Sequence, residues 1–262
     1  MSSRLRVEDD GIVVRVTLAR PQVRNAFDEE LIADLTRAFQ SVGESRRAVV
    51  LSGEGPSFCA GADIAWMRRA GGYSREENEA DALRMARMLA AIDGCPKPVV
   101  AVVHGAAIGG GVGLVAAADI AIAAEGTVFS LSEVKLGILP SVISPYVLRA
   151  IGPRQARRYF LTGERFDARE ALRIGLAHLV APAEEIPASC DRLVAALLTS
   201  GPEAVGAAKS LIARVAGRSP EEVMPLTVQT IAERRASAEA REGLSAFLEK
   251  RPPSWSPKNP AR

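Results

Sequence analysis

The hydrophobic pattern divides the chain into two parts near residue 186. Up to about residue 180, short apolar runs typical of strands alternate with amphipathic stretches of helical period. Over 187–251 the helical period continues, and Gly and Pro interrupt it near 201–202 and 217–220. The pattern therefore predicts an α/β core over residues 1–186 and a helical arm and tail over residues 187–262.

Within the core, the pattern predicts a hairpin, with strands at 4–8 and 11–18, and a helix that begins after Asp28 and ends near Val42. A second, short helix is predicted after Asp63. Residues 132–140 are expected to form a loop. Further strands are predicted at 47–51, 119–123, 127–131 and 178–180, and further helices near 74–92, 143–151, 153–161 and 167–174.

One stretch organises the core. Residues 98–103 form a Val-rich apolar run without amphipathic period, which indicates a strand buried on both faces. The run breaks at Gly105, and residues 109–111 are three glycines that precede an apolar helical pattern over 112–118. A helix that starts on glycines leaves backbone N–H groups unpaired and open to an anion or an oxyanion.

A second glycine-rich loop, residues 52–63, also follows a predicted strand and precedes a predicted helix. If the two strands are parallel neighbours, both loops lie at the same end of the sheet. One N–H from each could then hold a single carbonyl oxygen as an oxyanion hole. The alternative is that both loops are simple strand–helix turns.

The segment from Gly111 to Ala116 also fits G-x-G-x-x-A, and Glu133 follows about 20 residues later, as in a dinucleotide fingerprint. Three features count against this alternative. The glycine turn already starts at Gly105, the helix after it spans only about eight residues, and the first strand–helix unit of the chain has no glycine signature.

Glu133 is the titratable residue nearest downstream of the glycine turn. Its apolar flanks, Leu131, Val134, Leu136 and Ile138, predict partial burial and a raised pKa. His104 and His178 are expected in turns or the core, and Asp119 is expected to cap or pair at the start of a strand.

Composition narrows the classes of function. The 262 residues are 48% hydrophobic with a net charge of +2, which gives no electrostatic case for nucleic acid or an anionic membrane. We expect no transmembrane helix and no secretory signal. Three cysteines without CxxC spacing favour a reduced, cytoplasmic setting and no disulfide or metal site.

Three blocks carry a family resemblance: FCAGADI at 58–64, HGAAIGGGVGL at 104–114 and SEVKLGILP at 132–140. Residues 20–27 and 247–251 add an N-terminal and a C-terminal block. In this order they resemble the crotonase, or enoyl-CoA hydratase/isomerase, superfamily over nearly the whole chain. The resemblance implies a spiral of ββα units with a C-terminal helical trimerisation arm, assembled as a homotrimer or a dimer of trimers.

The resemblance also implies an acyl-CoA substrate and no separate cofactor, because coenzyme A is part of the substrate. The thioester oxygen would be held by the N–H groups of Ala62 and Gly110, and Glu133 would be the catalytic acid–base. The implied acyl-CoA contacts are Arg24, Ala26, Ala60, Asp63, Ile64, Gly109 and, from a neighbouring subunit, Lys250. The expected acyl pocket consists of Trp66, Met67, Val142 and Ile143.

The sequence departs from the superfamily at Gly113, where hydratases with two carboxylates have a glutamate. A single acid resembles the double-bond isomerases, whereas the local string is closer to bacterial branched-chain hydratases of the 3-methylglutaconyl-CoA type. Ser141 stands where an aryl dehalogenase needs a carboxylate, which argues against dehalogenation. We therefore predict a 2-enoyl-CoA hydratase, with a double-bond isomerase or a weakly catalytic CoA-binding or RNA-binding scaffold as alternatives.

Overall fold

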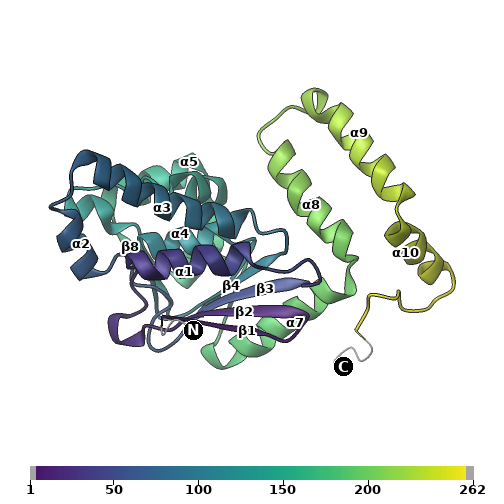
Figure 1. Cartoon of the computed structure of the whole chain (residues 1–262), viewed down its shortest axis with the longest axis horizontal. Coiled ribbons are helices and arrows are strands. Elements are labelled where there is room, and N and C mark those ends of the chain that lie inside the picture. The colour runs from purple at the N-terminus through teal and green to yellow at the C-terminus, as the bar shows by residue number, and fades with distance from the viewer. Residues whose placement is uncertain (1–3, 258–262) are drawn as a thin grey trace. The chain divides into compact units, whose positions relative to one another are not determined.

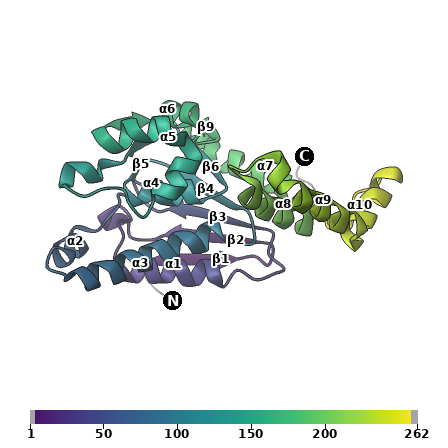
Figure 2. The same ribbon diagram turned by 90° about the horizontal axis from the view of Figure 1, so that it is seen from above.

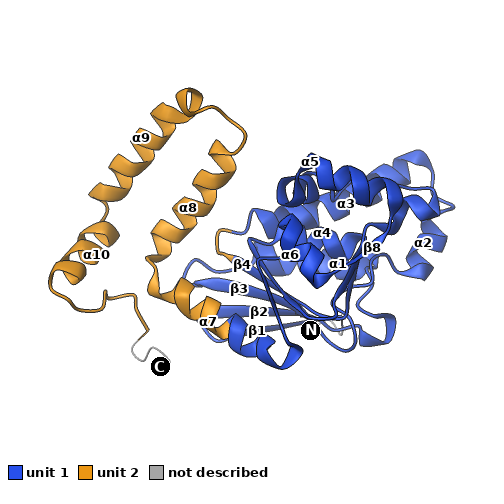
Figure 3. Ribbon diagram, turned by 180° about the vertical axis from the view of Figure 1, so that it is seen from behind, with its two compact units in different colours: residues 1–95, 99–190 blue, residues 96–98, 191–262 orange. Residues whose placement is uncertain are grey.

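The structure, a computed structural model that describes residues 4–257, separates the chain into two units (Figure 3). Unit 1 consists of residues 1–95 and 99–190, and unit 2 of residues 96–98 and 191–262. Each unit is described by itself below.

A six-stranded sheet forms the framework of unit 1. Its order is β1-β2-β3-β4-β6-β9, and every neighbouring pair is parallel except β1 and β2. The antiparallel pair is the predicted hairpin. The strands are Leu5–Asp9, Val13–Leu18, Ala48–Gly53, Val99–Val103, Ile120–Ala124 and Leu179–Ala181.

A second, three-stranded sheet has the order β5-β7-β8, with β5 parallel and β8 antiparallel to β7. Its strands are Ala106–Ile108, Val128–Ser130 and Arg165–Asp167. Of these, β7 was predicted, whereas β5 and β8 were not. β5 lies between Gly105 and Gly109, where a glycine turn was expected, and β8 lies between the helices predicted at 153–161 and 167–174. The expected loop at 132–140 likewise contains a 3-10 helix, η2 (Ser132–Leu136).

Helices cover the large sheet of unit 1, and α1 packs beside α3 (Figures 1 and 2). Helix α4 contacts α3, α5 and β4, so it lies inside the unit, and all eight of its residues are buried. The helices are α1 (Glu29–Gln40), α2 (Ile64–Ala70), α3 (Arg75–Asp93), α4 (Gly110–Ala117), α5 (Ser144–Thr162) and α6 (Ala168–Ile174), and 3-10 helices span Pro21–Val23 and Ala183–Glu185.

The helix starts follow from local sequence. Asp28 accepts the N–H of Leu31, and Asp63 accepts those of Ala65 and Trp66, so both predicted N-caps are confirmed. The two helices predicted at 143–151 and 153–161 form α5, which Gly152 interrupts with non-helical backbone (φ 71°).

Unit 2 is helical, as predicted, and two breaks fall at the predicted Gly and Pro positions, near 201–202 and 217–220, whereas the break at Ser237 was not predicted. It contains α8 (Pro202–Val215), α9 (Pro220–Ala236) and α10 (Ala238–Leu248), and α7 (Ile186–Thr199) runs into it from unit 1. The Glu239 carboxylate accepts the N–H groups of Glu203 and Ala204 at 2.8 Å, which joins α10 to the start of α8.

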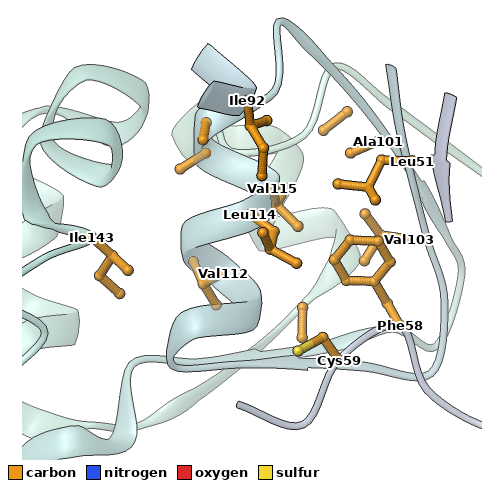
Figure 4. Close-up of a cluster of buried hydrophobic side chains, with 14 of the residues drawn as sticks. Leu51, Phe58, Cys59, Ile92, Ala101, Val103, Val112, Leu114, Val115 and Ile143 are labelled. Atoms are coloured by element: carbon orange, nitrogen blue, oxygen red, sulfur yellow. The ribbon is translucent and has the colours of Figure 1, made fainter. Parts of the chain in front are cut away.

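The core of unit 1 lies where α4 meets the central strands (Figure 4). Leu114 and Val115 of α4 are buried with Leu51 of β3 and Val103 of β4. Ile143, at the N-cap of α5, lies on the other side of α4 in this view. The glycine-rich start of α4 is therefore fixed between a buried sheet and a second helix.

Candidate active site

The two glycine loops lie side by side. Because β3 and β4 are parallel neighbours, the loops that follow them leave the same end of the sheet. A bridge joins them: the Cys59 N–H donates to Ala106 O at 3.0 Å, and the Ile108 N–H donates to Cys59 O at 3.0 Å. This confirms the arrangement of parallel neighbours that the oxyanion-hole hypothesis required.

Glycine is needed where the loops touch. A Cβ at Gly61, whose φ is +90°, would lie 2.8 Å from Ile108 O, and a Cβ at Gly111 would lie 2.5 Å from Cys59 O. Both obstacles are backbone oxygens, which cannot move aside as the tip of a side chain can. The close approach of the two backbones therefore depends on the missing side chains.

Two backbone N–H groups remain available at this junction. Gly110 is the first residue of α4, so its N–H has no intrahelical acceptor. The residues on either side of Ala62 form hydrogen bonds with Phe27: the Phe27 N–H donates to Gly61 O at 2.7 Å, and the Asp63 N–H donates to Phe27 O at 2.8 Å. Within residues 4–257, neither the Ala62 nor the Gly110 N–H donates a backbone hydrogen bond.

The Glu133 carboxylate lies against the N-cap of α4. Its Oε1 is 3.0 Å from the position that a Cβ on Gly109 would take, and burial raises the pKa of the carboxyl. Its Oε2 is buried and finds no hydrogen-bond partner in the described part of the chain. The expected partial burial and raised pKa are confirmed.

The reason given for that burial was partly wrong. Leu131 is buried, but Leu136 and Ile138 are 63% and 55% exposed. They stand on η2 and just beyond it and turn away from the core, whereas Glu133 is covered at the start of α4. Flanking apolar residues therefore did not identify the surface that buries this acid.

The position of the missing glutamate is filled. A Cβ on Gly113 would lie 2.3 Å from Cγ2 of Ile143, which is 2% exposed. Gly111 faces Cys59 O in the same way. The glycines of the G-x-G pattern thus serve internal packing, and this geometry removes the support for a pyrophosphate-binding turn.

Arg20 lies beside the candidate site and makes contacts that the sequence did not reveal. Its guanidinium pairs with Asp28 at 3.0 Å and Asp63 at 3.1 Å, and it donates to Ala26 O at 2.5 Å. One cation thus joins the N-caps of α1 and α2 beside the loop that carries Ala62. Sequence reasoning found both caps separately, but no local signal shows that they converge.

The implied contacts with the CoA portion differ in exposure. Arg24 is exposed in left-handed backbone (φ 52°), and its carbonyl accepts the Ala60 N–H at 2.9 Å. Ala26 is buried, and Ile64 is 67% exposed. Lys250 is exposed and belongs to unit 2.

Two of the expected acyl-pocket residues, Trp66 and Ile143, are buried, and the other two, Met67 and Val142, are half-buried. Trp66 is 8% exposed, and its Nε1 has no hydrogen-bond partner among the residues that the structure describes. A buried donor of this kind usually meets a water or a ligand.

The remaining polar residues singled out from sequence have structural contacts. Nδ1 of His178 accepts the Ala121 N–H at 3.1 Å, and Nε2 of His104 lies 2.8 Å from Gly55 O. Asp119 accepts the Val99 N–H at 2.7 Å, at the start of β4. These contacts confirm the predicted roles in turns and at strand starts.

An open depression of about 550 Å³ lies elsewhere in unit 1, and the Glu170 carboxylate on its lining is already paired within the protein. The Tyr159 hydroxyl donates to Glu170 at 2.5 Å, and Arg173 pairs with the same carboxylate. Hydrogen bonds from Arg173 and Tyr159 lower the pKa of Glu170 to about 2, whereas burial raises the pKa of Tyr159 to about 12. We therefore place the candidate site at Glu133 rather than here.

The comparisons agree with this fold. The family model described as enoyl-CoA hydratase/isomerase matches residues 8–258, and the chain belongs to this family, within the crotonase superfamily. YngF of Bacillus subtilis is 35% identical over 244 residues, which are 90% of this chain and 91% of that protein.

Solved structures are similar over nearly the whole chain. An enoyl-CoA hydratase from Shewanella pealeana has a TM-score of 0.92 and 41% identity, and covers 96% of both chains. AtuE of Pseudomonas aeruginosa has a TM-score of 0.93 and 37% identity, over 97% of this chain and 100% of its own. The crotonase-type α/β fold is thereby confirmed. No helix within residues 4–257 is long and apolar enough to cross a membrane.

Proposed function

We propose that this protein is an enoyl-CoA hydratase that adds water to a 2-enoyl-CoA thioester. The observation that carries the proposal is the Glu133 carboxylate at the glycine start of α4, whose buried Oε2 has no hydrogen-bond partner among the residues that the structure describes. A buried carboxyl with a raised pKa beside open backbone donors suits general acid–base chemistry at a thioester.

In this mechanism the Ala62 and Gly110 N–H groups hold the thioester oxygen. Negative charge builds on that oxygen when water attacks Cβ and an enolate forms, so fixed donors stabilise the transition state more than the substrate. Glu133 takes a proton from the attacking water, and the hydroxide adds to Cβ. The protonated carboxyl then returns a proton to Cα.

The rest of the acyl-CoA would be bound by the residues that the family pattern suggests. The backbone around Ala60, Asp63 and Ile64, together with Ala26 and Gly109, would line the CoA groove, and Arg24 and a neighbouring subunit's Lys250 would meet its phosphates. Arg24 makes no ion pair within the described chain, which leaves its charge available for this role. The proposed setting is cytoplasmic.

The acyl group itself would lie near Trp66, Met67, Val142 and Ile143. The indole N–H of Trp66, which has no partner within residues 4–257, supports an acyl chain that carries an acceptor, such as the distal carboxylate of a 3-methylglutaconyl group. A hydrogen bond to a charged acceptor is worth about 1.5–3 kcal/mol. A Trp66→Phe variant should therefore lose more activity on that thioester than on an unsubstituted chain.

A double-bond isomerase is the second candidate, because Ile143 fills the place of a second acid. A lone Glu133 could remove a proton from C2 and return it to C4. Purified protein should be offered 2-enoyl, 3-enoyl and 3-methylglutaconyl thioesters while the enoyl-thioester absorbance is followed. Loss of a 2-enoyl signal supports the hydratase, and its appearance from a 3-enoyl substrate supports the isomerase. Silence throughout contradicts both and leaves the scaffold.

The proposed assembly is a homotrimer or a dimer of trimers built through the helical arm. Apolar side chains on single faces of α9 and α10 are exposed: Met224, Val228 and Ile231 on the first, and Leu244, Phe247 and Leu248 on the second. Exposed apolar faces of this kind are usually covered in an assembly. Sedimentation at micromolar concentration should give a multiple of three times 27.7 kDa, and a species of a single chain's mass would contradict the assembly.

A further inference from the structure

Packing, rather than backbone conformation, requires glycine at position 113. Gly113 lies within α4 and has no positive φ, so its backbone would accept any L-residue. Glycine in a helix costs about 1 kcal/mol relative to alanine. A Cβ there would meet Cγ2 of Ile143 at 2.3 Å and its Cβ at 2.9 Å, whereas Cδ2 of Leu89 at 3.7 Å is an ordinary contact. Ile143 is therefore the residue that excludes a side chain.

Ile143 and Glu133 lie against the same end of α4. The Gly113 N–H donates to Gly109 O at 3.2 Å, so these two glycines are one helical turn apart. Oε1 of Glu133 faces Gly109, and Cγ2 of Ile143 faces Gly113. An apolar side chain thus occupies the position one turn along the helix from the candidate acid.

We propose that Ile143 restricts this site to the chemistry of one acid, because it fills the volume that a carboxylate at position 113 would need. The proposal rests on the function proposed above. In hydration, an O–H bond of water breaks as its oxygen bonds to Cβ, and the proton passes to Glu133. The enolate's electron pair then takes that proton at Cα, and Glu133 is a carboxylate again. Both proton transfers therefore use the carboxylate oxygens of Glu133.

The activity test uses but-2-enoyl-CoA and three variants: Gly113→Glu, Ile143→Ala and the double variant. Gly113→Glu alone should lose activity through the clash. The folded double variant should hydrate this straight-chain substrate at least about tenfold faster than Ile143→Ala, with a second ionisation in its pH–rate profile. A folded double variant that is no faster than Ile143→Ala overturns the proposal.

If the double variant does not fold, a double-mutant cycle of thermal stability tests whether Ile143 is the residue that excludes a side chain at position 113. Gly113→Ala should lower the Tm by about 4 °C or more in the wild type and by clearly less in an Ile143→Ala background, where the 2.3 Å contact with Cγ2 is gone and only the 2.9 Å contact with Cβ remains. Leu89→Ala is the matched control background, in which Gly113→Ala should lower the Tm by as much as it does in the wild type. Equal losses in the Ile143→Ala and wild-type backgrounds overturn the proposal. Wild-type activity on the thioester panel is measured separately, so silence there refutes the proposed function and not the packing claim.

Discussion

Replacement of Glu133 by Gln tests the proposed chemistry most directly. The two side chains have the same shape, so the contact with Gly109 is kept while the acid–base group is lost. Positioned acid–base catalysis supplies about 10²–10⁴ in rate, which corresponds to about 2.7–5.5 kcal/mol of barrier. We expect kcat on the best thioester to fall by that factor, with binding of CoA unchanged by calorimetry.

Glu133→Asp is the matched control for position. It keeps the carboxyl but withdraws it by one methylene from the start of α4, and displacements of about 1 Å can cost about a hundredfold. We expect the Asp variant to have a reduced kcat that still depends on pH, whereas the kcat of the Gln variant should not depend on an ionisation at position 133. Survival of the Gln variant within about threefold of the wild type would refute Glu133 as the catalytic base.

The same substitution should change the pH dependence of stability. Burial raises the pKa of Glu133 above its ordinary 4.5. Its favourable contribution to the free energy of unfolding is therefore complete below pH 4.5 and is lost as pH rises through the pKa that Glu133 has in the folded protein. Gln has no charge to bury. In urea titrations, the Gln variant should therefore be more stable than the wild type at about pH 8 and should lose that advantage by about pH 4.

Three further predictions concern the frame of the site. Gly111→Ala places a Cβ against Cys59 O, so it should lower the free energy of unfolding in urea titrations by about 1–3 kcal/mol and also lower kcat/KM. Gly43 has open space around it, so the free energy of unfolding of Gly43→Ala should be within about 1 kcal/mol of the wild-type value. Arg20→Met removes one ion-pair partner from the buried carboxylates of Asp28 and Asp63 and should lower the free energy of unfolding by about 3 kcal/mol. Arg75→Met removes an exposed ion pair and should lower it by less than about 1 kcal/mol. Equal losses would show that the ion pairs of Arg20 do not stabilise the fold. Burial raises the pKa of the Cys59 thiol to about 12, so folded protein should leave it unalkylated by iodoacetamide at pH 8, and rapid labelling in a peptide map would contradict its burial.

Local sequence determined the parts of the fold that depend on short-range physics. The hairpin at the N-terminus, the caps at Asp28 and Asp63, and the helix breaks near 201–202 and 217–220 all follow from residues within a few positions of one another. The buried strand β4 followed from its continuous apolar run. The family resemblance followed from the ordered glycine blocks, and the family match confirms it.

Tertiary structure decided what depends on residues far apart in the chain. The contact of Ile143 with Gly113 and the ion pair of Arg20 with Asp63 join residues 30 or more positions apart along the sequence. The strands β5 and β8 both pair with β7, and the local sequence pattern predicted neither of them. The sequence therefore singled out Glu133 as the candidate acid, but only the packing of Ile143 against α4 shows that position 113 has no room for a side chain, because excluded volume is a property of the assembled core.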